Sequence, residues 1–136
     1  MNEPARFATA GAVAAIVWAL AEPVDRRLFR YDYSDVAVLG KFVTTGHGWR
    51  PIGLLLHAAN GAAFGLAYQE AKRRRGWSAL RLAMLEHLAL YPLSALVDGR
   101  HPARGSAGVP KLLTPRAFAQ ATVRHAVFGT VLGRLA

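Results

Sequence analysis

The sequence predicts an all-α fold: a four-helix transmembrane bundle built from two repeated helical hairpins, with a short interfacial helix between the first two helices. Composition is the first observation behind this prediction, since 53% of the 136 residues are hydrophobic and only 18% are charged. The second is a series of apolar segments that approach the thickness of a bilayer, without strand-like alternation. The third is a repeat, because the pattern His-x3-Gly-x3-Gly begins at His57 and recurs at His125.

The charge of the chain fits this class. The net charge is +9, and most of the 17 Lys and Arg residues fall between the apolar segments. Membrane proteins confine cations to loops and helix ends in this way, whereas a nucleic-acid binder gathers them on one exposed face. We therefore expect no nucleic-acid partner, and contact with a lipid bilayer whose anionic headgroups lie near one basic cluster. That cluster consists of Lys72, Arg73, Arg74 and Arg75. The chain has no cysteine, which excludes disulfides and thiolate chemistry.

The first helix is predicted at about residues 5–22. Residues 7–21 carry no charge, and at about 1.5 Å per residue they span roughly 22 Å. Because this is shorter than a hydrocarbon core, Trp18 and Glu22 are expected near a membrane interface, and Asp25 marks the exit. The end of the run also resembles a signal-peptidase site, which gives an alternative interpretation of this segment.

A short surface helix is predicted at about residues 35–44, within the long connection that follows. Ser34 is placed to cap its N-terminus, and apolar residues from Val36 onward recur at helical spacing. With Tyr33 before it, the segment fits an amphipathic helix that lies on the bilayer with aromatic rings at headgroup depth. A lid packed on the bundle is the alternative.

The other three helices are predicted at about residues 52–71, 79–97 and 115–135. Pro51 opens the first of them, where a proline is tolerated in the first turn. Ser78 and Thr114 are placed to cap the next two. Pro92 should kink the third helix, because it removes a backbone donor.

The repeat predicts how the helices pair. His57 and His125 are 68 residues apart, and Pro23 and Pro92 are 69 apart, so the first and second helices should form one half and the third and fourth the other. Each half has an even number of spans, so the two halves should have the same orientation and the termini should share one side. The dense basic cluster predicts that this side is cytoplasmic.

The glycines of the repeat are predicted to be helix-packing positions. Small residues four apart let backbones approach closely in a bilayer, where no hydrophobic force drives helices together. This applies to Gly61, Gly65, Gly129 and Gly133. We expect a homo-oligomer, first of all a dimer, through these faces. A close approach of backbone to a ligand is the alternative.

Polar side chains within the predicted spans form a candidate intramembrane network. Its members are His57, Asn60, Glu86, His87, Tyr91, Ser94, Asp98, Arg124 and His125. Those from His87 to Asp98 share one helix face by their spacing. Glu86 and Arg124 are the most costly residues to place in hydrocarbon, so we expect either an ion pair between them or a bend that lets each reach water. The network is either a set of interhelical hydrogen bonds or a proton, ion or ligand site.

Cofactors and catalysis find little support in the sequence. No metal site is expected, because no HExxH is present and no two histidines lie four apart on one predicted helix. Haem between two of the three span histidines is an alternative. No cofactor is predicted otherwise. The sequence favours a non-enzymatic role, although Asp98, Arg100 and His101 could serve a lipid-modifying enzyme.

Two elements together resemble small bacterial inner-membrane proteins of the YagU-like kind. They are the His-x3-Gly-x3-Gly element from His57, and Arg124-His125 followed by Phe128, Gly129 and Gly133. The resemblance implies a multi-helix protein of the bacterial inner membrane and contributes no catalytic residues.

Three functions are compatible with these observations. The leading one is a helix-packing or permeation and transport module in the membrane. The second is a soluble or peripheral four-helix bundle that binds an apolar ligand or an anionic membrane surface. A lipid-modifying membrane enzyme is the third.

Overall fold

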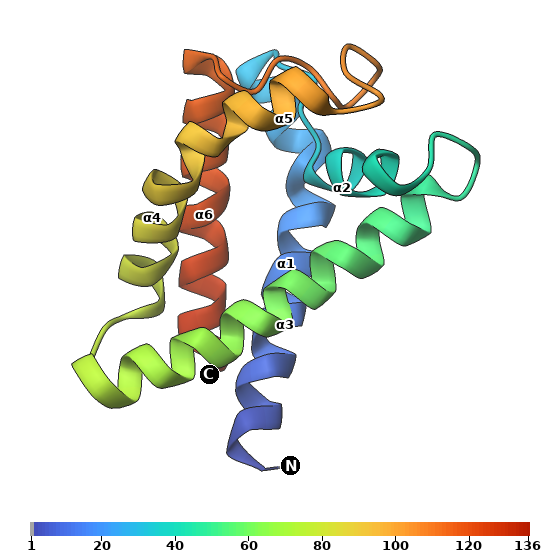
Figure 1. Cartoon of the computed structure of the whole chain (residues 1–136). Helices are drawn as coiled ribbons and strands as arrows, with labels where there is room; N and C mark the ends of the chain where they lie inside the picture. The colour runs from blue at the N-terminus through green and yellow to red at the C-terminus, as the bar shows by residue number, and fades with distance from the viewer. Residues whose placement is uncertain (1) are drawn as a thin grey trace.

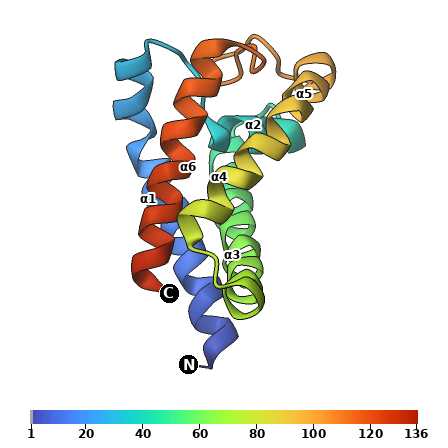
Figure 2. The ribbon, with the colours of Figure 1, turned by 90° about the vertical axis from the view of Figure 1, so that its left-hand side faces the viewer.

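The computed structural model describes residues 2–136 and is all-helical, as the sequence predicts. Its elements are α1 (Glu3–Phe29), α2 (Asp35–Val43), α3 (Trp49–Arg75), α4 (Ala79–Leu90), the 3-10 turn η1 (Tyr91–Leu93), α5 (Ser94–Arg100) and α6 (Pro115–Leu135). Helix α6 runs beside α1, α3 crosses α1 obliquely, and α4 with α5 runs back along α6 (Figures 1 and 2). Both termini and the α3–α4 connection lie at the same end of the molecule (Figure 1).

Predicted caps begin three of the helices. The side chains of Ser34, Ser78 and Thr114 each accept a hydrogen bond from the backbone N–H three residues further on. These bonds satisfy donors that have no partner within the helix. The 3-10 turn η1 contains Pro92 and separates α4 from α5, so the predicted kink is present at that proline.

Helix α1 is longer than predicted. The chain was expected to leave the helix near residue 22 and Asp25, yet α1 continues through Pro23 to Phe29. That prediction was wrong because Glu22 and Asp25 are both buried and have partners inside the protein, so they do not end the helix at an interface. The 27 residues of α1 extend about 40 Å.

Glycines set the distance between the paired helices. A Cβ at Gly65 of α3 would lie 2.1 Å from the carbonyl oxygen of Phe7 in α1, and one at Gly129 of α6 would lie 2.7 Å from the Cα of Leu80 in α4. Gly133 is less crowded, since its Cβ would meet the nearest atom, the Cβ of Ala79, at 3.5 Å. Because three of the four named glycines are in close contact within the chain, an oligomer would require a different face.

Helix α2 packs on α3, which corresponds to the lid alternative. A Cβ at Gly40 would lie 2.0 Å from the carbonyl oxygen of Trp49, and one at Gly53 would lie 2.0 Å from that of Val36. The N-terminus of α2 turns into the molecule, and Tyr33 lines a cavity, where its hydroxyl donates to Asp35. The position of Tyr33 at headgroup depth stays a prediction.

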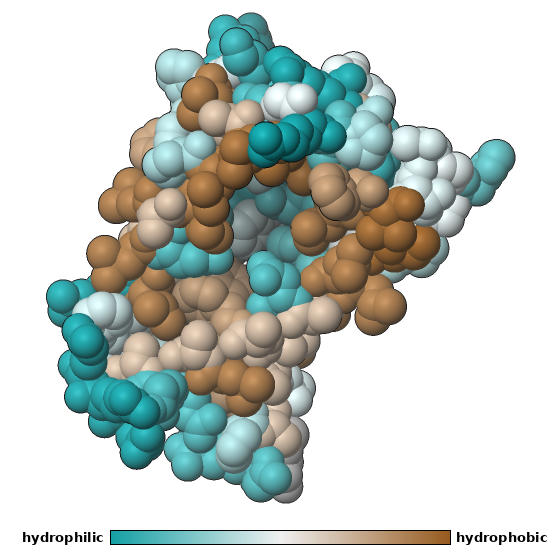
Figure 3. Space-filling model, in the orientation of Figure 1, coloured by the Kyte–Doolittle hydropathy of each residue, from teal (hydrophilic) through white to brown (hydrophobic). Residues whose placement is uncertain are grey.

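The distribution of side chains is the reverse of that in an ordinary soluble bundle. Many of the buried residues are alanine, glycine or polar residues, whereas large aliphatic side chains point outward. The exposed ones on α1 and on α4 with α5 are Val13, Ile16, Val17, Leu20, Val24, Leu28, Leu80, Leu85, Leu88, Leu90, Leu93 and Leu96. Hydrophobic rims appear on either side of a central hollow in Figure 3. Two stretches of the described chain are long and apolar enough to cross a membrane, Glu3–Phe29 and Ala79–Arg100.

Equivalent glycines of the two repeat elements should differ in their tolerance of alanine. Gly65→Ala should lower the free energy of unfolding by about 1–3 kcal/mol, because its new methyl meets backbone atoms that cannot move aside. Gly133→Ala is the matched control and should change stability little, because its methyl has room. Thermal unfolding in detergent, followed by circular dichroism, measures both. Equal losses in the two variants would contradict this packing.

Candidate functional site

Arg124 of α6 is the centre of a buried ion-pair cluster. Its side chain is 2% exposed, and it binds Asp25 of α1 with two bonds, Nε to Oδ2 at 2.5 Å and Nη2 to Oδ1 at 2.6 Å. Nη1 donates to Oδ2 of Asp35 at 2.6 Å, and Nη2 also donates to the Tyr33 carbonyl at 2.8 Å. A planar guanidinium has five N–H donors, so this arrangement uses most of them. Gln120, one turn earlier, adds a bond to Asp25.

A second carboxylate holds the start of α2 in place. Oε2 of Glu22 accepts from the Ser34 hydroxyl at 2.6 Å, and Oε1 accepts from the Asp35 backbone N–H at 2.8 Å. Oε1 also lies 3.7 Å from Nη1 of Arg124. The N-terminus of α2 is thus fixed from α1 by a negative charge, which the helix dipole favours.

The environment of Asp35 keeps this acid ionised. Burial by itself would raise the pKa of the Asp35 carboxyl, but the charges of Arg124 and His57 and the hydrogen bonds from Tyr33 and Arg124 together hold that pKa below its ordinary value. Tyr33 donates its hydroxyl to Oδ1 of Asp35 at 2.5 Å, and the Trp18 indole N–H donates to Oδ2 at 3.1 Å. Burial and the adjacent Asp35 charge raise the pKa of the Tyr33 hydroxyl well above its ordinary value, so this hydroxyl remains a donor.

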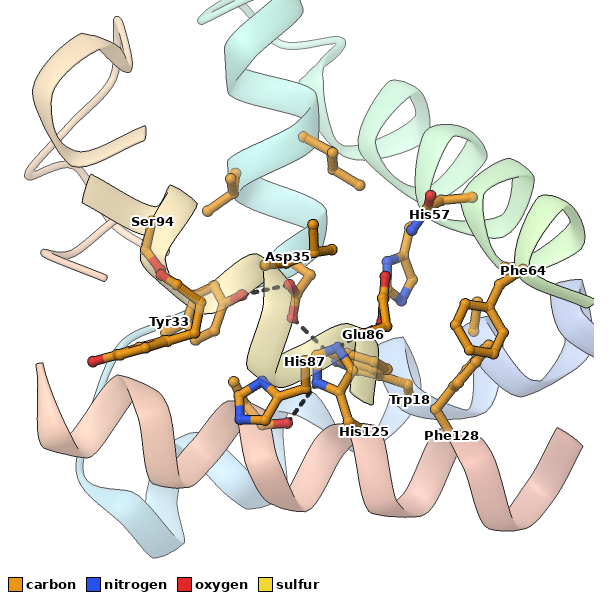
Figure 4. A pocket seen from close by; sticks show the side chains of 18 residues that line it. Trp18, Tyr33, Asp35, His57, Phe64, Glu86, His87, Ser94, His125 and Phe128 are labelled. Carbon is orange, nitrogen blue, oxygen red and sulfur yellow. Dashed lines mark hydrogen bonds and ion pairs between the residues drawn. The ribbon is translucent and has the colours of Figure 1, made fainter. Parts of the chain in front are cut away.

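A cavity of about 230 Å³ lies in front of this cluster. Its polar lining residues are Tyr33, Asp35, His57, Asn60, Glu86, His87, Tyr91, Ser94 and His125. The apolar ones include Trp18, Val38, Leu39, Phe64, Leu90 and Phe128 (Figure 4). The hollow opens on the side of the bundle, between α4 and the α2–α3 pair, rather than at either end (Figure 3).

Trp18 lies between the two histidines of the repeat. Its ring centroid is 5.3 Å from that of His57 and 4.8 Å from that of His125, both in edge-on geometry. His57 is 6% exposed, and its Nε2 is buried without a hydrogen-bond partner. A buried polar atom without a partner is costly, so this nitrogen marks a place where a ligand or water would gain a bond.

Glu86 and His125 contact each other at the wall of the cavity. Nδ1 of His125 lies 2.7 Å from the Ala121 carbonyl, which only accepts, so Nδ1 carries a hydrogen. Nε2 of the same ring lies 3.3 Å from a carboxylate oxygen of Glu86, and the contact is an ion pair only when the ring is protonated.

The structure brings seven members of the predicted network to one cavity and separates two. Asp98 accepts from the backbone N–H groups of Leu112 and Leu113 at 2.6 and 2.8 Å, so it fixes the connection before α6. Arg124 lies behind the cavity wall. The predicted ion pair between Glu86 and Arg124 was wrong, because Arg124 is held by acids of α1 and α2 and leaves Glu86 to His125.

Three functional residues were missed from the sequence. Trp18, Tyr33 and Asp35 line the cavity, although the sequence placed the first near an interface and the other two in a surface segment. The run of acids and tyrosines at residues 31–35 was a signal for a polar site. Its partner is 89 residues away, in Arg124, which local patterns do not reveal.

The arrangement of the histidines and acids bears on the metal and haem alternatives. No group of three or more His, Cys, Asp or Glu among residues 2–136 could hold a metal ion. The rings of His87 and His125 contact each other, with centroids 4.6 Å apart, so a haem has no room between them. His101 and Asp98, considered for a lipid-modifying enzyme, are bound to backbone groups.

Comparisons with family models, curated proteins and solved structures find no match for this chain.

Removal of Arg124 should be more damaging than removal of any one of its acids. Arg124→Gln leaves Asp25 and Asp35 buried without a counter-charge, and should lower the free energy of unfolding by about 3–5 kcal/mol. Adding Asp25→Asn should restore part of the loss, whereas adding Glu86→Gln should restore none. Arg134→Gln, at an exposed position near the C-terminus, is the matched control. Rescue by Glu86→Gln in detergent unfolding experiments would refute this assignment of partners.

Proposed function

We propose that the chain is an integral membrane protein that acts as a permeation module, and that the permeating molecule places a polar group in the cavity. The observation that carries the proposal is the inverted distribution of side chains. Aliphatic residues cover the outside, while Arg124 and its acids are buried at 11% exposure or less, apart from Asp35 at 19%. In a bilayer this arrangement places aliphatic side chains against the lipid and keeps the charged side chains paired inside the protein.

Helix lengths support four membrane crossings. Helices α1 and α3 have 27 residues each, Ala79–Arg100 has 22 and α6 has 21. At about 1.5 Å per residue, each reaches the roughly 30 Å of a hydrocarbon core. The apolar character of α3 and α6 is reduced by inward-facing residues such as His57, Gln120 and Arg124, which lipid would not contact.

The position of the cavity supports permeation. Its lining residues Trp18, Glu86 and His125 fall near the middle of their helical segments, so the cavity lies at mid-depth. There Glu86 contacts His125 at 3.3 Å, and His57 has an unpartnered nitrogen. A bacterial inner membrane with cytoplasmic termini remains the location that the sequence predicts.

Membrane extraction tests the location. The protein should stay with the membrane after an alkaline carbonate wash and leave it only in detergent, because its aliphatic surface would otherwise face water. A soluble or peripheral bundle would be released by the wash. Release of the folded protein would therefore overturn the proposal.

Cysteine reactivity tests the cavity. The chain has no cysteine, so single thiols can be placed at Ser94, which lines the cavity, and at Leu88, which is 55% exposed on α4. A thiol reacts as the thiolate, which requires water. In intact membranes Ser94→Cys should react with methyl methanethiosulfonate at least about tenfold faster than Leu88→Cys, whose thiol faces lipid. In a soluble bundle Leu88→Cys would react at least as fast.

A further inference from the structure

Most hydrogen-bond donors of the cavity are already used by the protein. The hydroxyl of Tyr33 and the indole of Trp18 donate to Asp35. The hydroxyl of Tyr91 donates to the Thr114 carbonyl, and the hydroxyl of Ser94 donates to the carbonyl of Tyr91. These groups have no free hydrogen to offer to a ligand.

The groups left over are mainly acceptors. The Thr122 hydroxyl donates its one hydrogen to the Phe118 carbonyl, so Nε2 of His87 must donate to that hydroxyl at 2.9 Å. In the neutral ring this leaves Nδ1 of His87 with a free lone pair. Oε1 of Glu86 accepts no hydrogen bond from residues 2–136, while Oε2 faces His125. Nε2 of His57 is buried and unpartnered, and the amide of Asn60 adds an acceptor oxygen together with its N–H donors.

Charge and aromatic rings favour the same kind of ligand. The lining contains two carboxylates, Asp35 and Glu86, and no lysine or arginine. The nearby Arg124 is engaged by Asp25 as well as by Asp35. Aromatic rings of the lining, such as that of Trp18, present faces and edges that attract a cation or pack on apolar groups. A ligand that donates hydrogen bonds and carries positive charge, an ammonium group, meets these conditions.

The size and the opening of the cavity define the rest of the ligand. At about 230 Å³ it is smaller than the roughly 300–1,000 Å³ that holds a drug-sized molecule, so it admits a head group only. Its apolar lining includes Val38, Leu39 and Leu90, and α4, which carries Leu90, also has exposed leucines. We infer that the cavity binds the ammonium head group of a single-chain amphiphile that enters from the side of the bundle. This inference rests on the membrane location proposed above.

Tryptophan fluorescence tests the inference. Trp49 and Trp77 lie outside the cavity against basic side chains, so Trp49→Phe with Trp77→Phe leaves Trp18 as the only reporter. In maltoside micelles at neutral pH, dodecylammonium should change Trp18 emission with a saturable isotherm. Dodecanol and dodecanoate, with the same chain, should not. Butylammonium should bind at least about tenfold more weakly, since it lacks the chain.

Charge-neutral variants locate the binding group. Glu86→Gln in the same background should weaken dodecylammonium binding at least about tenfold, because a charge-assisted hydrogen bond is lost. Glu70→Gln, on the exposed surface of α3 beside Arg73 and Arg74, is the matched control and should leave binding unchanged. If Glu86→Gln does not fold, the comparison of the three head groups in the parent protein still tests the inference.

Two results would overturn the inference. Equal responses to the three twelve-carbon probes would mean that the chain partitions without recognition of the head group. Equal affinity for butylammonium would mean that no amphiphile is selected. Failure of the membrane location is a separate outcome. If only that proposal is wrong, the carbonate wash releases the protein, and the protein still distinguishes the three head groups. If only the present inference is wrong, the protein stays in the membrane after the wash and does not distinguish the head groups.

Discussion

The buried charge of Arg124 is the constraint on which the rest of the structure depends. A guanidinium inside a bundle is tolerated only when carboxylates and carbonyls surround it, and here they come from α1 and from the start of α2. This requirement extends α1 past Pro23 so that Asp25 reaches the cluster. It also turns the N-terminus of α2 inward, where Asp35 becomes both a partner of Arg124 and a wall of the cavity.

The cavity results from the way in which the helices pair. Small residues draw α3 onto α1 and α6 onto α4, and the Arg124 cluster joins α1 to α6. Few contacts join α3 to α4, so the two pairs are held together along one side and separated along the other. The polar residues that face this gap lie between rims of leucine. The same packing that closes each hairpin therefore leaves the bundle open on the side.

Local patterns were enough to predict most of the helices but not the ion pairs. Capping by Ser34, Ser78 and Thr114 and the interruption at Pro92 depend on residues within one turn, so they could be inferred from sequence. The partners of Arg124 lie 89 and 99 residues away, where spacing carries no information. Glu86 seemed its natural partner because both lie near the centre of neighbouring helices. In the folded chain Arg124 instead pairs with Asp25 and Asp35.

The His-x3-Gly-x3-Gly element connects this packing to the chemistry of the cavity. Residues four and eight apart share one helix face, so the glycines that press α3 onto α1 also fix the height and direction of His57. The equivalent element on α6 does the same for His125, and the two rings meet Trp18 of α1 from different helices. A side chain larger than glycine at Gly61 or Gly65 would move α3 away from α1 and withdraw His57 from the cavity. Close helix contact is thus the means by which the histidines are placed, and Gly61 in addition forms part of the cavity lining.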